Sequence, residues 1–272
     1  MIDDLDSLST TKKKWRLCSM NQVEEVKLLL RLIPIWLTSL MYGTVFSQIN
    51  TFFTKQGSTM NTKITSHFHV PPASLQVSIC LVVIVAVPIY DRVIIPIARK
   101  ITGYPSGITM LQRIGIGIIL SVFAMVAAAL VEARRVTIAR EHALMDQPHS
   151  TVPMTIWWLL PQYVIVGVSE VFGVIGLQEL FYDQMPYEMR SMGAAAYLSV
   201  FGIGSFISTG IISVIQWISE RGGDKWLGNN LNRAHLDYYY WVLAGLITLS
   251  LCGYLAVAKS FVYKKISSNA ML

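Results

Sequence analysis

Charged residues are scarce in this sequence, and their scarcity excludes several classes of protein. Asp, Glu, Lys and Arg make up 14% of its 272 residues, whereas 53% of the residues are hydrophobic. This balance is far from that of a disordered chain and unusual for a water-soluble domain. The sequence also lacks a Gly-x-x-x-x-Gly-Lys-Ser/Thr loop, which argues against an ATP-driven pump encoded in this chain.

Reactive clusters are missing as well. The chain has three cysteines, Cys18, Cys80 and Cys252, of which two fall in apolar segments, so we expect neither a disulfide framework nor a metal site. We find no catalytic signature that pairs a nucleophile with a base. The sequence therefore predicts no enzyme and no metalloprotein.

Long uncharged runs are what the sequence does contain. Six such runs of 18 to 29 residues lie at 32–54, 70–90, 114–131, 150–169, 191–219 and 238–258. A hydrocarbon core of about 30 Å needs ~20 helical residues, and a spanning segment must be helical because no water satisfies its backbone. A soluble helical protein would show amphipathic stripes instead. The sequence predicts an all-α polytopic membrane protein.

Six helices and short loops are expected to fill the chain and leave no room for a separate soluble domain. We predict a cytosolic linker at 1–27, a six-helix bundle at 28–265 and a cytosolic tail at 266–272. The predicted helices are approximately 28–54, 70–95, 110–131, 153–180, 190–219 and 238–260.

The net charge of +6 indicates an orientation in the membrane better than it indicates a nucleic-acid partner. If both termini share one side, that side receives fourteen of the Lys and Arg residues and the opposite side eight. The positive-inside rule then predicts that both termini are cytosolic, although Arg134 and Arg135 work against this assignment. Basic clusters beside the helices are also expected to meet anionic lipid headgroups.

Glu170 is the one acidic residue expected inside a membrane helix. Apolar residues surround it from Pro161 to Phe172, and keeping a carboxylate ionised there costs about 2.5 to 3.5 kcal/mol. Such a group is expected either to bind a cation or to carry a proton. The alternative is a structural ion pair, but the six runs contain no second ionisable residue to complete one, and Glu179 is expected at the membrane interface.

Polar residues gather on one side of the first predicted helix. Thr44, Ser47 and Thr51 share a face at helical spacing, which indicates a water-filled cavity or hydrogen bonds that join helices. For the amides of Gln48 and Asn50 the cavity is the favoured interpretation. Glycines in later helices are expected at close helix contacts, namely Gly115, Gly117, Gly202, Gly204 and Gly210.

Seven ordered segments resemble the C-terminal half of the proton-coupled oligopeptide transporters, and most closely the plant nitrate and peptide transporter branch. They are 32–36, 43–48, 70–74, 90–92, 111–115, 161–163 and the Glu170 segment, spread over about residues 15 to 265. The resemblance implies the C-terminal six-helix bundle of a major facilitator fold, helices seven to twelve of twelve.

The same resemblance implies the site. Glu170 would face a central cavity and bind substrate or couple it to protons, while Asp91 and Arg92 would form a cytosolic gate loop. Relatives carry an acid where this chain has Ser47, and a plant nitrate transporter carries a histidine where it has Phe46, so one proton site and one nitrate-binding imidazole are absent here. The other residues expected to line the cavity are Tyr42, Phe46, Ser47, Gln48, Asn50, Tyr163, Tyr197 and Phe206.

The implied function is proton-coupled symport of small peptides, nitrate or other small organic anions, with protons as the coupling ion and no other cofactor. The family's first-helix Glu-x-x-Glu-Arg motif has no counterpart in this chain, so transport would need an N-terminal six-helix bundle as partner. The protein is expected in the plasma membrane or the vacuolar membrane. The alternative is a truncated membrane protein that does not transport and that associates with full-length relatives.

Overall fold

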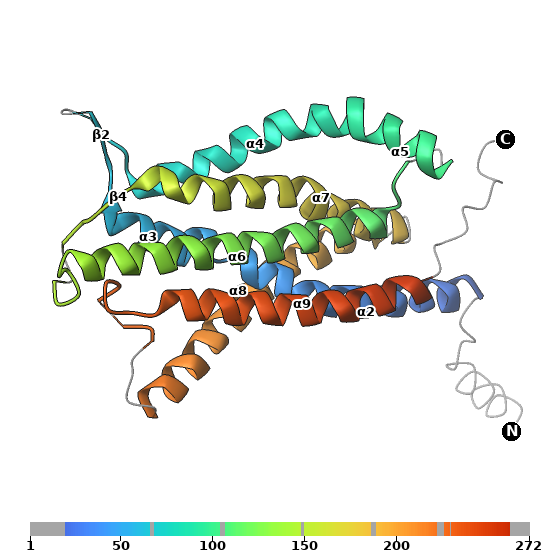
Figure 1. Ribbon diagram of the computed structural model, residues 1–272. Coiled ribbons are helices and arrows are strands. Elements are labelled where there is room, and N and C mark those ends of the chain that lie inside the picture. The colour runs from blue at the N-terminus through green and yellow to red at the C-terminus, as the bar shows by residue number, and fades with distance from the viewer. Residues whose placement is uncertain are drawn as a thin grey trace, which may run out of the picture.

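Six long helices dominate the structure, a computed structural model that describes residues 20–65, 68–103, 107–147, 150–185, 189–221, 226–228 and 230–261 (Figure 1). By length and composition, six spans can cross a membrane: Val26–Ser58, Pro72–Thr102, Met110–Glu141, Ile156–Gln184, Arg190–Arg221 and Leu236–Ser260. The predicted all-α membrane fold is confirmed.

The α-helices carry these spans. They are α2 (Met20–Phe46), α3 (Thr54–Ser58), α4 (Gln76–Ile89), α5 (Ile95–Thr102), α6 (Met110–Glu141), α7 (Leu160–Gln184), α8 (Arg190–Arg221) and α9 (Leu236–Ser260). Shorter π- and 3₁₀-helical segments join or extend them: η2 (Ile49–Phe53), η3 (Pro72–Leu75), η4 (Tyr90–Ile94) and η5 (Ile156–Leu159).

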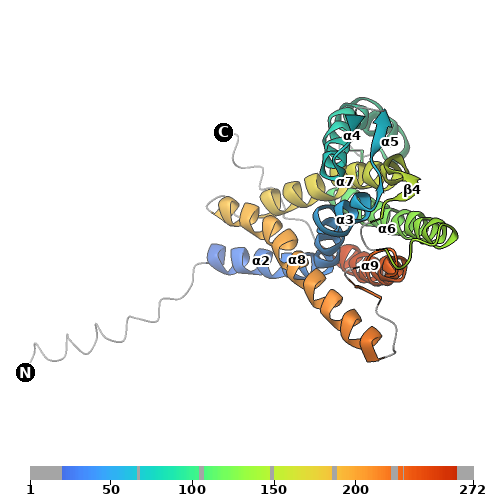
Figure 2. The same ribbon diagram turned by 90° about the vertical axis from the view of Figure 1, so that its left-hand side faces the viewer.

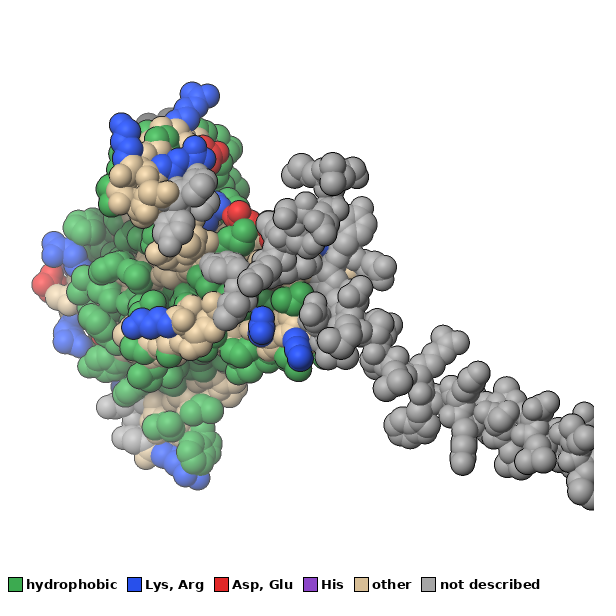
Figure 3. All heavy atoms as spheres, turned by 90° about the vertical axis from the view of Figure 1, so that its right-hand side faces the viewer, with side chains coloured by type: hydrophobic (Ala, Val, Ile, Leu, Met, Phe, Trp, Pro, Cys, Tyr) green, Lys and Arg blue, Asp and Glu red, His purple; other side chains and the backbone are tan. Residues whose placement is uncertain are grey.

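Four very short strands lie at one end of the bundle. β1 (Met60–Asn61) pairs in parallel with β4 (Val152–Thr155), and β2 (Lys63–Thr65) pairs antiparallel with β3 (Phe68–His69). We call this the strand end. The other end, where α2 begins and α9 finishes, we call the terminal end; Figure 3 views the molecule from there and shows several blue Lys and Arg groups around a green apolar body.

Helix α6 lies between α7 and α9 and packs against both (Figure 1). Helix α2 packs against α8 and α9, while α4 packs on the outside of α7 (Figures 1 and 2). Both views show the last turns of α8, in orange, projecting away from the other helices. The core is apolar and lies where α2, α6, α7 and α9 meet.

Local sequence explains where several helices begin and end. Thr109 caps α6: its hydroxyl accepts from the Gln112 N–H at 3.2 Å, and the Gln112 side chain accepts from the Thr109 N–H at 3.1 Å. Pro161 stands in the first turn of α7, where its missing N–H costs nothing. Gly103 ends α5 with a φ of +71°, in the left-handed region that glycine adopts freely.

Several helices depart from the predicted bounds: the span from Pro72 continues to Thr102 instead of ending at 95, and α7 runs from Leu160 to Gln184 instead of from 153 to 180. Helix α2 already begins at Met20, so the last eight residues of the predicted linker, 20–27, are helical, whereas residues 1–19 and 262–272 lie outside the described part of the chain. Helix α6 continues to Glu141, ten residues beyond the predicted end at 131. At ~1.5 Å per residue its 32 residues measure about 48 Å, more than a hydrocarbon core requires.

Candidate functional site

Glu170 lies midway along α7, between the terminal and strand ends. Its side chain is partly exposed, and no described residue forms a hydrogen bond or ion pair with its carboxylate. An unpaired carboxylate inside an apolar span is costly unless it takes up a proton or a cation. The alternative of a structural ion pair therefore finds no support among the described residues.

The residue before Glu170 fixes that part of α7 to two other helices. The Tyr42 hydroxyl donates to the Ser169 backbone oxygen at 3.1 Å, and the Ser169 hydroxyl donates to the Gly117 oxygen at 2.8 Å. Tyr42, on α2, and Ser169 are both buried, with 3% and 2% of their surface exposed. Buried hydrogen bonds of this kind hold Glu170 at the junction of α2, α6 and α7.

Glycines one turn either side of Glu170 bring the neighbouring helices close. A Cβ at Gly167 would lie 2.9 Å from the Val82 side chain of α4, and one at Gly173 would lie 2.6 Å from the Tyr42 ring. A Cβ at Gly117 would collide with the backbone of Gly173. Small residues at such crossings let membrane helices approach closely, so the Glu170 segment is tightly positioned on both sides.

We expect Gly117→Ala to separate α6 from α7 and to destabilise the protein by about 1 to 3 kcal/mol, as overpacking does, because the backbone of Gly173 cannot move aside as a side chain can. The measurement is the thermal unfolding midpoint in detergent. Gly202→Ala is the matched control, since no described atom lies within 4 Å of its Cβ position. Equal losses at both positions would contradict the close α6–α7 contact.

Thus the expected close contacts occur at Gly117 and at Gly204, whose Cβ would collide with Gly43 of α2. They do not occur at Gly202 or Gly210, where the described chain leaves open space, and Gly115 makes only an ordinary contact with Tyr254. The sequence does not distinguish these glycines because the pattern of helix crossings decides which face of α8 meets α2.

Helix α2 is interrupted at Ser47 and Gln48, where regular α-helical bonding gives way to the π-helical segment η2. The Gln48 amide donates to the Thr44 oxygen at 2.9 Å and to the Ser208 hydroxyl of α8 at 3.0 Å. Its amide oxygen accepts from the Tyr239 hydroxyl of α9 at 3.3 Å. Gln48 therefore connects α2, α8 and α9 at the interruption.

These contacts correct part of the predicted cavity lining. Gln48 and Tyr163 have no exposed surface and Tyr42 has 3%, so all three are enclosed within the bundle and do not line a space open on its surface. Tyr163 packs edge-on against Phe53, with ring centroids 5.4 Å apart. The amide and hydroxyl groups join helices, which was the other interpretation of polar residues in membrane helices.

The remaining candidates lie nearer the surface. Phe46 is partly exposed and packs edge-on against Phe201 at 5.0 Å, and Tyr197 is also partly exposed. Asn50 and Phe206 are exposed, the latter by 79%, and no described hydrogen bond or ring contact joins either to the Glu170 segment. Ser47 is partly exposed, and its hydroxyl donates to the Thr44 oxygen at 2.7 Å.

Asp91 and Arg92 do not form a loop. They lie in η4, inside the span Pro72–Thr102. This span continues past them without a break and ends where Gly103 caps α5. Both side chains are exposed, and neither forms an ion pair with a described residue. The gate prediction is therefore corrected from a loop to an exposed pair of charges on a helix.

A polar cluster beside η4 is not predicted from the sequence. Arg113 of α6 forms an ion pair with Glu179 of α7 at 2.9 Å, donates to the Val171 oxygen at 3.1 Å and lies 4.4 Å from the Tyr90 ring centroid. Glu179 is 42% exposed, which agrees with a position near an interface. The cluster ties η4, α6 and α7 together next to Asp91.

A second unforeseen cluster lies near the strand end of α6. Arg135 and Glu132 are fully buried and form a two-bond ion pair, at 2.8 and 2.6 Å. Arg135 also donates to the Asn232 side chain at 2.9 Å and to the Leu231 oxygen at 2.7 Å. The sequence prediction ended this helix at 131, although the i,i+3 spacing of the two charges is typical of a helical ion pair. That spacing was the missed signal.

Comparison with known proteins agrees with this architecture. Residues 2–229 match the model of the POT family. Two Arabidopsis thaliana proteins, NRT1/PTR FAMILY 5.4 and NRT1/PTR FAMILY 5.10, are each 55% identical to the chain, over 269 and 253 residues. These alignments cover 99% and 93% of this chain but 48% and 45% of the relatives, so the chain spans about half their length.

Solved structures share the fold. An auto-inhibited POT family peptide transporter superposes with a TM-score of 0.72 at 19% identity, over 92% of this chain and 44% of its own. The POT family transporter PepTSo gives 0.66 at 20% identity, over 88% and 42%. The relatives are transporters and not enzymes. The six helices of this chain are arranged as in the two solved structures. With most of its length matched by the family model, this multi-pass membrane chain belongs to the POT family.

Proposed function

We propose that the native protein is a proton-coupled symporter and that this chain supplies its C-terminal six-helix bundle. The substrate would be nitrate, a small peptide or another small organic anion. The observation that carries the proposal is Glu170, a partly exposed and unpaired carboxylate in the middle of an apolar span. The relatives are transporters, which supports a transport role for the native protein.

The chemistry of Glu170 suits it to couple a proton to a solute. When the carboxylate is ionised, the surrounding apolar span disfavours it, and binding a proton or a cationic group of the substrate relieves that cost. Gly167, Gly173 and the buried Tyr42–Ser169 hydrogen bonds fix its position, so the change of charge can be transmitted to α2 and α4. Phe46, Ser47 and Tyr197 are partly exposed and are the remaining candidates for a lining that meets the substrate.

A second six-helix bundle would complete the substrate path. Alternating access requires two bundles that move about a site near the middle of the membrane. The relatives are about twice as long as this chain, which supports an N-terminal bundle as the partner. The exposed Asp91 and Arg92 would meet that bundle at the cytosolic side when the transporter closes there.

Both termini are proposed to lie in the cytosol, at the terminal end of the bundle, in the plasma membrane or the vacuolar membrane. The excess of basic residues near that end supports this orientation.

The test is uptake by the native protein in sealed proteoliposomes. An imposed inward proton gradient should drive accumulation of labelled nitrate or of a labelled dipeptide, and a protonophore should abolish it. Accumulation that ignores the gradient would reject proton coupling. A native product of about 30 kDa that transports nothing would instead favour the non-transporting membrane protein.

A further inference from the structure

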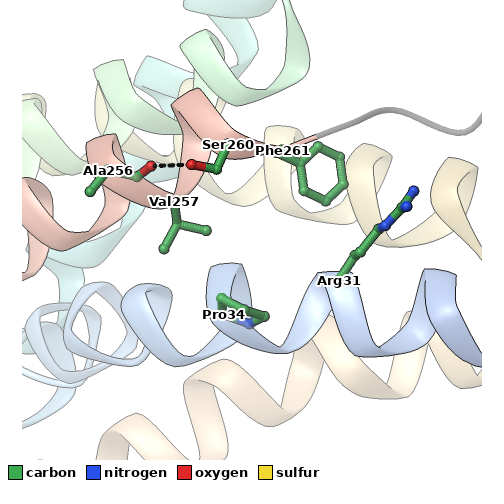
Figure 4. Close-up of a pocket in the computed structure, with 6 residues that line it drawn as sticks. All are labelled: Arg31, Pro34, Ala256, Val257, Ser260 and Phe261. Atoms are coloured by element: carbon green, nitrogen blue, oxygen red, sulfur yellow. Dashed lines mark hydrogen bonds between the residues drawn. The ribbon is translucent and has the colours of Figure 1, made fainter.

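A groove opens between α2 and α9 near the terminal end. It has a volume of about 420 Å³, within the range of ligand pockets. Figure 4 shows its lining, with α2 below and α9 above: Arg31, Pro34, Ala256, Val257, Ser260 and Phe261. None of these residues takes part in the Glu170 site, so the groove is independent of the proposed transport mechanism.

Small residues create the groove. Nearer the middle of the bundle α2 and α9 are in direct contact: the Ser250 hydroxyl of α9 donates to the Thr38 backbone oxygen of α2 at 2.5 Å. Toward the terminal end, Val257 points toward Pro34, and these two side chains together with Ala256 are too small to fill the space as the helices diverge. The Ser260 hydroxyl turns back to the Ala256 oxygen at 3.4 Å, which leaves the floor of the groove mostly apolar.

Positive charge surrounds the opening. Arg31 is exposed, and no described residue forms an ion pair with it. Lys27 stands one helical turn before it on the same face of α2, and Lys259 is exposed at the end of α9. The six lining residues include no acid. A basic opening above an apolar groove is complementary to a molecule with an anionic head and a hydrocarbon chain.

The groove is continuous with apolar surface that would face lipid. Leu30 and Leu37, on either side of the groove along α2, are each 57% exposed, and Leu255 of α9 is 46% exposed. A free anion would gain nothing from such a surface, whereas an acyl chain would bury there. Basic sites between membrane helices at the cytosolic face are suited to anionic lipid headgroups.

We infer that this groove binds one anionic phospholipid of the surrounding leaflet, with its phosphate at Arg31 and one acyl chain along Pro34 and Val257. Phe261 covers the chain near the headgroup. The bound lipid would fill the space between the two diverging helices and would hold α2 and α9 in their observed separation.

Native mass spectrometry of the delipidated native protein tests the inference. After addition of phosphatidylglycerol, one lipid should stay bound, and the thermal unfolding midpoint should rise; phosphatidylcholine with the same acyl chains should do neither. Arg31→Gln should weaken retention by about fivefold, the effect of one basic group at a membrane surface. Ala256→Leu keeps every charge but fills the groove, and it should weaken retention as well.

Arg233→Gln is the control, because the side chain of this arginine is 76% exposed at the strand end and its ion pair with Asp146, at 3.9 Å, is exposed as well. It should bind phosphatidylglycerol as the unaltered protein does. Undiminished retention by the Arg31 variant would overturn the inference. Equal retention of phosphatidylcholine would also overturn it, because it would indicate a purely apolar cavity. So would an equal rise of the unfolding midpoint with inorganic phosphate and with phosphatidylglycerol, because it would indicate a site for free anions.

Discussion

We expect Glu170→Gln to abolish proton-driven accumulation of the substrate while the protein still inserts and folds. Glutamine has nearly the shape of glutamate but cannot take up and release a proton, and the next acid along α7 is Glu179, nine residues away. We expect initial rates under an imposed proton gradient to fall at least about tenfold, because removal of the charge changes the energy of the site by more than ~1.4 kcal/mol. The measurement is labelled uptake in proteoliposomes.

Exchange across equal substrate concentrations separates two roles of Glu170. If the residue serves only proton coupling, the Gln variant still exchanges labelled for unlabelled substrate without a gradient. If it also holds the substrate, exchange falls together with accumulation. Asp183→Asn, an exposed acid on the same helix, is the matched control and should leave both unchanged. Normal proton-driven accumulation by the Glu170 variant would remove this residue from the mechanism.

Arg135→Met gives the largest loss of stability that we expect from a single substitution in this chain. It leaves the fully buried Glu132 without its two hydrogen bonds and without a compensating charge, and it frees the buried Asn232 oxygen. Breaking a buried ion pair from one side typically costs about 3 to 5 kcal/mol. The thermal unfolding midpoint in detergent, or the half-life of the folded protein on heating, measures the effect.

The double variant Glu132→Leu, Arg135→Met should recover a large part of this loss. Replacing a buried ion pair by apolar residues of similar volume often leaves the stability unchanged, because the desolvation cost of both charges is removed together. Arg233→Met is the control, since its pair with Asp146 is exposed on both sides and is worth about 0 to 1 kcal/mol. A double variant as unstable as the single one would show that the hydrogen bonds to Leu231 and Asn232, rather than the charge of Glu132, dominate.

Several features of the protein follow from the sequence without the structure. Hydrocarbon cannot satisfy a free backbone, so uncharged runs of about 20 residues have only one available form, and six runs gave six helices. The apolar neighbours of Glu170 along its own helix can likewise be read from the sequence, because residues up to two turns away on that helix are uncharged. The ordered motifs sufficed for the family.

Tertiary structure alone decided which polar residues are free and which are paired. Gln48 and Tyr163 looked like cavity residues by helical position, yet contacts from α8, α9 and η2 enclose them. Arg135 looked like a loop residue because charge is costly in a membrane, but Glu132 and Asn232 satisfy its guanidinium and let α6 continue to Glu141. Glu170 remains unpaired among the described residues because none of the described helices brings a basic side chain to it. Such outcomes depend on contacts between residues far apart in the chain, which local spacing does not specify.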